Sequence, residues 1–197
     1  VRTLIGTLTG VAATAMVAYV LSRRDFYFNK LFTVLFVITM YVSGGLVPEY
    51  LLITRSLKLG NHFLVYILPG LIWVYNIILI RSFIDGLPIA LQEAARIDGL
   101  SEIKIFAKLY FPTMKSTYAA AAVITFMNAW NAYLWPKVVM TDNRAQTMPM
   151  LIANIASGYS IDYGMLMMGV LFCSIPTMIV FFVLQKQFAE GITGAVK

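Results

Sequence analysis

Hydrophobic positions occur along this chain in long blocks, separated by short polar segments. Five blocks run over Thr3–Ser22, Leu31–Tyr50, Phe63–Ile80, Thr117–Trp135 and Met165–Leu184. Crossing a bilayer as a helix takes about 20 residues, which is close to the length of each block. Lipid offers the backbone no hydrogen-bond partners, so apolar blocks of this length are expected to be helical. The pattern predicts an all-α integral membrane protein, a polytopic bundle with five spans.

Composition supports lipid as the surrounding solvent. The 197 residues are 60% hydrophobic and 12% charged, with a mean hydropathy of +0.79. Soluble domains are typically about 45–50% apolar and about 25% charged. Cys173 is the one cysteine and His62 the one histidine, so the sequence predicts no disulfide and no metal site.

The basic residues divide unequally between the connecting segments. Ten would lie on one side of the membrane and five on the other, which together account for the 15 in the chain. Lys and Arg are enriched on the cytoplasmic side, so we expect the segment near residue 100 and the C-terminus to be cytoplasmic. The net charge of +6 then reflects topology, and no nucleic-acid partner is predicted. With five spans Val1 would lie outside, which predicts that an N-terminal span is missing. The ten are Arg23, Arg24, Lys30, Arg81, Arg96, Lys104, Lys108, Lys115, Lys186 and Lys197, and the five are Arg2, Arg55, Lys58, Lys137 and Arg144.

Some spans contain helix-breaking residues. The second ends in "SGGLVPEY", and the third contains Pro69, Gly70 and Asn76. Broken helices often line substrate paths, whereas Gly44 and Gly45 could instead allow close helix packing. In the fifth span Pro176 predicts a bend. The segment "TMPMLIANIASGY" before it predicts a short interfacial helix, capped by Thr147.

A polar island, "LQEAARIDGLSEIKIFAKLYFP", separates the third and fourth spans. Leu91, Ala94 and Ala95 share one side of a predicted helix. Asp98 and Gly99 follow and should end it, because glycine readily adopts the left-handed conformation found after helices.

A second short helix is expected after this turn. Ser101 can cap it, Ile103, Phe106, Ala107 and Tyr110 form its apolar face, and Pro112 ends the segment. Two amphipathic helices with a polar outer face, each attached to a span, suit docking into a groove of another protein. The alternative is a pair of surface helices that packs only against its own chain.

The island resembles the EAA motif of binding-protein-dependent ABC importer permeases. Glu93, Ala94, Ala95, Gly99 and Pro112 match that motif at its spacing, and Phe111 stands where Leu is usual. The stretches "AYVLSRRDF", "FMNAWNAYLWP", "MPMLIANIASGY" and "FAEGITGAVK" look like the carbohydrate-uptake branch, the relatives of maltose and multiple-sugar permeases.

The resemblance implies one transmembrane domain over residues 1–197, with about six spans in the full protein. It implies a bacterial inner-membrane location, a second permease subunit, two cytoplasmic ATPase subunits and an extracytoplasmic sugar-binding protein. ATP and Mg²⁺ would belong to the ATPases, and this chain would carry no cofactor. Within a coupling segment of about 83–115, Glu93 to Gly99, including Asp98, would form the helix that fits an ATPase cleft. The tail from Gly191 to Lys197 would also touch the ATPases.

Candidate substrate contacts come from the amides in the spans. Asn128, Asn131 and Trp135 follow i, i+3, i+7 and are predicted to share one side of a helix. Buried amides should face the bundle interior or a water-filled path. Asn128 and Asn131 could either contact the substrate or form hydrogen bonds between helices. Asn76 is a further candidate for substrate contact. Trp135 also suits an interfacial aromatic belt.

The sequence predicts a transport subunit rather than an enzyme. It has no G-x-x-x-x-G-K-[ST] loop, so ATP hydrolysis must come from a partner. Alternatives are a related permease for a non-sugar solute, such as peptide or phosphonate, and a membrane-embedded enzyme. The second is disfavoured, because the repeated "IDGL" places its aspartates outside the spans, each before a glycine that favours a turn.

Overall fold

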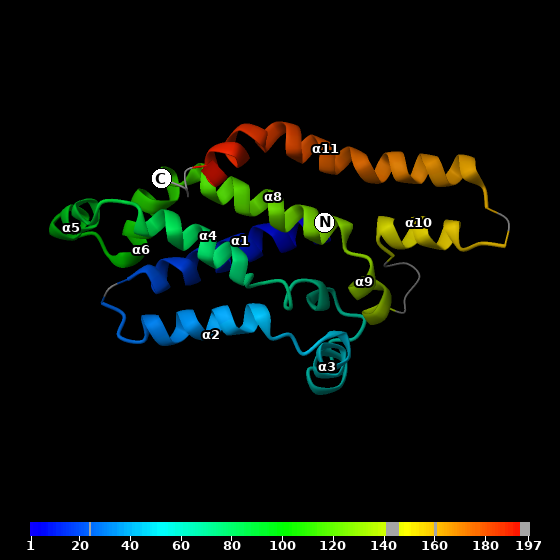
Figure 1. Ribbon diagram of the computed structural model, residues 1–197, viewed down its shortest axis with the longest axis horizontal. Coiled ribbons are helices and arrows are strands. Elements are labelled where there is room, and N and C mark those ends of the chain that lie inside the picture. The colour runs from blue at the N-terminus through cyan, green and yellow to red at the C-terminus, as the bar shows by residue number, and fades with distance from the viewer. Residues whose placement is uncertain (24, 141–145, 160, 194–197) are drawn as a thin grey trace.

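Long helices lie side by side and form the body of the protein (Figure 1). The structure is a computed structural model that describes residues 1–23, 25–140, 146–159 and 161–193. Within those ranges all regular elements are helical, which confirms the predicted all-α class. The long helices are α1 (Arg2–Ser22), α2 (Asn29–Tyr41), α4 (Val74–Asp85), α8 (Lys115–Asn131) and α11 (Tyr163–Thr193).

Shorter elements gather at the two ends of this body (Figure 1). Helices α5 (Ile89–Ile97) and α6 (Glu102–Ile105) form one end, which we call the α5–α6 end. Helices α3 (Leu46–Leu51) and α9 (Leu134–Val139) lie toward the opposite end, which we call the α3–α9 end. Helix α10 (Met148–Ala156) lies beside α11, so the short helix predicted between the last two spans is present.

Two helices are long and apolar enough to cross a membrane by themselves, among the residues that the structure describes. They are Arg2–Ser22 and Tyr163–Gln187. Two bent pairs raise the number to as many as four if each pair counts as one span. The first pair, Asn29–Tyr41 with Leu46–Ser56, bends by 112°, and the second, Val74–Asp85 with Ile89–Ile97, bends by 77°. Helix α8 has 17 residues, so five uninterrupted spans stay a prediction.

The glycines of the predicted second span form a turn rather than a packing surface. Gly44 and Gly45 are both exposed and follow the end of α2. Gly45 has φ +83°, a left-handed conformation that glycine adopts without steric cost. The expectation that this pair brings two helices close together is therefore wrong.

The predicted third span, Phe63–Ile80, is helical only in its second half. A 3₁₀ turn covers Phe63–Tyr66, and α4 begins at Val74, after a segment that contains Pro69 and Gly70. Proline cannot donate a backbone hydrogen bond, and the chain stays irregular there because α1 supplies replacement partners. The Thr14 hydroxyl of α1 lies 3.5 Å from both the Leu71 carbonyl and the Trp73 amide nitrogen.

Small side chains allow α1 to approach this segment and the neighbouring helices. A Cβ built on Gly10 would lie 3.3 Å from the Gly70 carbonyl oxygen. Ala15 and Ala18 are buried against the same core as Ile80 of α4. Small residues at such contacts bring helices together in lipid, where apolar burial alone gives little driving force.

Helix α11 packs along α8 but presents its apolar surface outward. No residue in its most apolar window is buried within the chain, which suits contact with lipid or another subunit. The helix continues through Pro176, and Ser174 donates to the Val170 carbonyl oxygen at 2.9 Å. The tail predicted to touch the ATPases, Gly191 to Lys197, includes residues 194–197, which lie outside the described residues.

Candidate functional sites at the two ends of the bundle

Helix α5 contains the Glu-Ala-Ala sequence and projects at the α5–α6 end (Figure 1). Glu93 and Ala94 are exposed, and so are the turn residues Asp98 and Gly99. Gly99 has φ +76°, and backbone bonds from Gly99 and Leu100 to the last turn of α5 close the helix. Glycine suits this left-handed position, as the sequence predicts.

The buried faces of α5 and α6 differ from the sequence prediction. On α5 Ala95 is buried, whereas Leu91 is 44% exposed and Ala94 is also exposed. Beyond the turn, Ile105 and Tyr110 are buried, whereas Ile103 is 80% exposed. The prediction assumed regular α-helical spacing, but a π-helical turn over Phe106–Tyr110 places inward residues five apart. Ile103 is therefore left on the outer surface, as is Ile97, which is 86% exposed.

Pro112 does not end the polar segment. It lies in a further short helix, α7 (Phe111–Thr113), which continues directly from the π turn. The break before α8 falls at Met114, where φ is −108° and ψ is 29°. Ser101 precedes α6, but its side chain makes no capping hydrogen bond.

Arg96 connects α5 to two other segments. Its Nη2 lies 2.8 Å from Oδ2 of Asp25, in the connection between α1 and α2. The same nitrogen lies 2.7 Å from Oε1 of Glu102 in α6, and Nε donates to that oxygen at 2.8 Å. These bonds, first to Asp25 and then to Glu102, raise the pKa of Arg96.

Glu102 also connects to the core of the bundle. Its Oε2 accepts a hydrogen bond of 2.6 Å from the Tyr19 hydroxyl of α1. Partial burial raises the pKa of the Glu102 carboxyl, but the hydrogen bonds from Tyr19 and Arg96 outweigh burial and the net pKa is lowered. The carboxylate is therefore ionised at neutral pH.

The three candidate amides make different contacts. Asn76 is 1% exposed, and its Nδ2 donates to the Thr125 hydroxyl at 2.9 Å, which makes it a bridge between α4 and α8. Asn128 donates to the Ile124 carbonyl one turn back and lines a cavity of about 250 Å³ beside the irregular segment. Asn131 lines a different cavity, of about 290 Å³, next to α11.

The helical spacing predicted for Trp135 is wrong, because α8 ends at Asn131 and Trp135 belongs to α9. The Trp135 indole donates to the Val65 carbonyl at 3.2 Å. Trp135 nevertheless lines the same 250 Å³ cavity as Asn128, so the two meet through the fold rather than along one helix.

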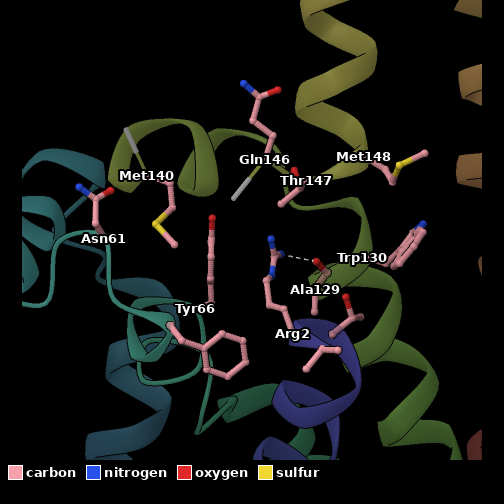
Figure 2. A pocket seen from close by; sticks show the side chains of 12 residues that line it. Arg2, Asn61, Tyr66, Ala129, Trp130, Met140, Gln146, Thr147 and Met148 are labelled. Carbon is pink, nitrogen blue, oxygen red and sulfur yellow. Dashed lines mark hydrogen bonds between the residues drawn. The ribbon is translucent and has the colours of Figure 1, made fainter. Parts of the chain in front are cut away.

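One cavity at the α3–α9 end was missed by sequence reasoning (Figure 2). It measures about 550 Å³ and is lined by Arg2, Tyr66, Trp130, Gln146 and Thr147 among others. Arg2 donates from Nη2 to the Ala129 carbonyl at 2.5 Å, as Figure 2 shows, and its guanidinium lies 4.4 Å from the centre of the Tyr66 ring. The Thr147 hydroxyl is buried without a hydrogen-bond partner in the described structure, and the buried Tyr66 hydroxyl lies near the Arg2 guanidinium. Arg2, a charged residue next to an apolar block, is the sequence feature that could have indicated this cavity, but basic residues were used only to predict membrane topology.

A cationic and aromatic lining of this kind suits a polar solute. Aromatic faces cover the carbon–hydrogen surfaces of a sugar, and buried hydroxyls can hydrogen-bond its hydroxyl groups. The 250 Å³ cavity shares Arg2, Tyr66 and Ala129 with the larger one, so the two adjoin. Within the described ranges no group of three or more His, Cys, Asp or Glu side chains could hold a metal ion.

Comparison with known protein families shows which family the chain belongs to. The model of the family described as the binding-protein-dependent transport system inner membrane component matches residues 6–194. The chain belongs to this family. Its members are membrane components of transport systems, so the chain is a transport component of the membrane and not an enzyme.

Several curated relatives match nearly the whole chain. The permease LacG of a lactose transport system from Rhizobium radiobacter is 35% identical over 98% of this chain and 71% of its own length. The permease AraQ of an arabinooligosaccharide transport system from Halalkalibacterium halodurans is 34% identical over 93% of this chain and 67% of its own. The permease UgpE of an sn-glycerol-3-phosphate transport system from Shigella flexneri is 31% identical over 97% and 67%.

A solved structure shares the fold. It is a bacterial ABC transporter involved in the import of the acidic polysaccharide alginate, and one of its chains superposes with a TM-score of 0.80. The match covers 95% of this chain and 73% of that one, at 24% sequence identity.

Proposed function

We propose that the chain is a permease subunit of an ATP-driven sugar importer in the bacterial inner membrane. In this proposal it forms the translocation path with a second permease subunit. Two cytoplasmic ATPase subunits hold ATP and Mg²⁺, and an extracytoplasmic sugar-binding protein delivers the solute. The family membership and the lactose and arabinooligosaccharide permeases among its relatives support this function.

The α5–α6 end is the proposed contact with the ATPases, within one transmembrane domain over residues 1–197 and a coupling segment of about 83–115. The observation that carries the proposal is a short helix that exposes Glu93 and Ala94 and ends at a left-handed Gly99. Ala95 anchors this helix to the bundle, and Asp98 is exposed in the turn. Pro112 begins the return toward α8.

The outer surface of this end suits a protein partner. Ile97 and Ile103 are largely exposed on either side of the Asp98–Gly99 turn. Two exposed isoleucines beside a carboxylate, Glu93, match an apolar cleft that carries a basic group. In this proposal the α5–α6 end faces the cytoplasm, in agreement with the basic residues of its sequence.

The α3–α9 end is the proposed entrance for the solute. The adjoining cavities around Arg2 and Tyr66 offer aromatic, hydroxyl and cationic groups in one place. Asn128 belongs to this path, since it lines one of these cavities. Asn131 faces a separate cavity, and the bond from Asn76 to Thr125 favours a role in joining helices.

A phosphorylated or otherwise anionic solute is a second candidate, in place of a neutral sugar. The guanidinium of Arg2 at the cavity favours it, and so does the similarity to a permease of an sn-glycerol-3-phosphate system. The bond to the Ala129 carbonyl leaves other guanidinium donors to meet an anion.

Uptake into proteoliposomes that contain the assembled importer tests the solute class. Labelled lactose, an arabinooligosaccharide and sn-glycerol 3-phosphate are each supplied with the binding protein and internal ATP. ATP-dependent accumulation of a sugar supports the leading proposal, and accumulation of glycerol phosphate alone supports the second candidate. Uptake that continues without the ATPase subunits contradicts both.

A further inference from the structure

Helix α5 is attached to the body of the protein by little apolar contact. Ala95, 8% exposed, is the one side chain of α5 that is buried, and it joins the core cluster that contains Ile105 and Tyr110. A helix with a single buried side chain is held less firmly in its orientation than a helix with a packed apolar face. Its orientation must therefore be set by other contacts.

Arg96 provides those contacts in two further directions. One carboxylate partner, Asp25, belongs to the connection between α1 and α2, and the other, Glu102, begins α6. Both distances are 2.8 Å or less, within the range of charge-assisted hydrogen bonds. The planar guanidinium presents its donors in a fixed fork, so it fixes the angles between its partners as well as the distances.

The connection extends into the buried part of the bundle. Glu102 accepts from the Tyr19 hydroxyl of α1, and Tyr19 is 7% exposed. The Tyr19 ring packs edge-on against Phe106 and Tyr110, with centroids 5.2 and 5.3 Å apart. A continuous series of bonds and ring contacts thus runs from α5 through Arg96 and Glu102 to α1.

We propose that Arg96 is a positioning residue that makes α5, the α1–α2 connection and the cytoplasmic half of α1 move as one body. The inference rests on the proposed docking of α5 to an ATPase. It adds the route by which a displacement of α5 reaches a membrane-spanning helix. Without Arg96, α5 would turn about Ala95 and the displacement would be lost.

The exposure of these ion pairs supports a role in positioning α5 rather than in stabilising the fold. The side chains of Arg96, Asp25 and Glu102 are 43%, 71% and 47% exposed. Exposed pairs of this kind contribute little to stability, so their loss leaves the fold intact. Removing Arg96 also leaves two carboxylates facing each other, and their repulsion would separate Asp25 from Glu102.

Pulsed electron paramagnetic resonance on the assembled importer with its ATPases tests this inference. Spin labels at Ala90→Cys in α5 and Val20→Cys in α1, in a Cys173→Ser background, report the distance between the two helices. With Arg96 present we expect one narrow distribution, the same without nucleotide and with ATP and vanadate. In Arg96→Gln we expect the distance distribution to widen roughly twofold, because α5 has lost its ion pairs and can sample other orientations.

Matched variants separate positioning from general charge effects. Lys108→Gln removes the same charge from the exposed surface of this end and should leave the distribution narrow. Asp25→Asn removes one partner and should widen it less than Arg96→Gln. Arg96→Lys keeps the charge without the fork and should fall between wild type and Arg96→Gln.

An Arg96→Gln distribution as narrow as that of the wild type would overturn the inference, and so would equal widening in Lys108→Gln. Loss of the ATPases from Arg96→Gln on purification would also overturn it, because Arg96 would then contact the partner directly. Failure of the wild-type chain to bind ATPases would instead count against the proposed function.

Discussion

The two ends of the bundle are built in opposite ways. At the α5–α6 end the backbone is helical, and a series of charged and aromatic side chains joins two stretches that are far apart in sequence, residues 19–25 and 96–110. At the α3–α9 end part of a predicted span is irregular, and polar and aromatic side chains line two adjoining cavities. The comparison indicates that one end is suited to transmitting force and the other to admitting a polar solute.

The largest effect is expected where α1 supports the irregular segment. In Gly10→Leu the added side chain meets the Gly70 carbonyl oxygen, 3.3 Å from the built Cβ. Overpacking of this kind costs about 1–3 kcal/mol, and the irregular segment would be displaced with loss of transport. Thermal unfolding in detergent measures the loss. Gly6→Leu is the control, since nothing lies within 4 Å of its Cβ, and equal destabilisation there would remove the special role of Gly10.

A second substitution acts on the other end alone. Gly99→Val places a β-branched residue at φ +76°, which costs about 1–2 kcal/mol although its Cβ has open space. We expect the turn after α5 to change shape and ATPase association to fall by about tenfold. Co-purification of the ATPases measures this. Gly86→Ala, at a negative φ nearby, should retain association, and an unaffected Gly99→Val would show that the turn does not shape the contact.

A smaller effect distinguishes helix joining from solute contact at Asn76. Asn76→Leu removes the bond to Thr125, whose hydroxyl still donates to the Ala121 carbonyl at 2.8 Å. It also removes an amide oxygen that is buried without a partner. The two changes offset each other, so we expect stability within about 1 kcal/mol of wild type. Uptake of the solute identified in the proteoliposome assay should keep its KM, and a raised KM would instead place Asn76 in the solute path.

The smallest effect concerns the acid side of the stability profile. The pKa of Glu102 is lowered in the folded protein, so its contribution to stability is present above the unfolded pKa, about 4.3, and is lost as pH falls through the folded value. Glu102 is 47% exposed, and solvent screening limits the contribution to less than about 1 kcal/mol. Glu102→Gln should therefore lower the free energy of unfolding at pH 7 by less than about 1 kcal/mol, and make that free energy less dependent on pH below about 4.3. A variant as acid-sensitive as wild type would show that other carboxylates dominate.

The sequence predicted those features that depend on local pattern. Apolar blocks located the long helices, and the Glu-Ala-Ala island located a helix that ends at Gly99. Its errors arise where contacts distant in sequence decide the outcome. The π turn that turns Ile103 outward leaves no periodic signal. Likewise Trp135 and Asn128 meet at a cavity that no helical spacing reveals.

The ion-pair series at Arg96 was equally hidden from the sequence. Arg96 and Glu102 are close along the chain, but Asp25 and Tyr19 reach them only through the packing of α1. The cavity around Arg2 depends on residues from α1, α8 and the segment before α10. In both places a charged residue was visible in the sequence, but its partners were not.

Protection of α5 from a membrane-impermeant maleimide tests most directly whether the α5–α6 end docks to an ATPase. One variant carries Ala94→Cys in a Cys173→Ser background. The control variant carries Tyr159→Cys in the same background, at an exposed position that follows the C-terminal end of α10. Adding the ATPase subunits should slow labelling at position 94 by about tenfold, as expected for a site buried in an interface, and leave position 159 unchanged. Labelling of position 94 at the same rate with and without the ATPases would contradict the account.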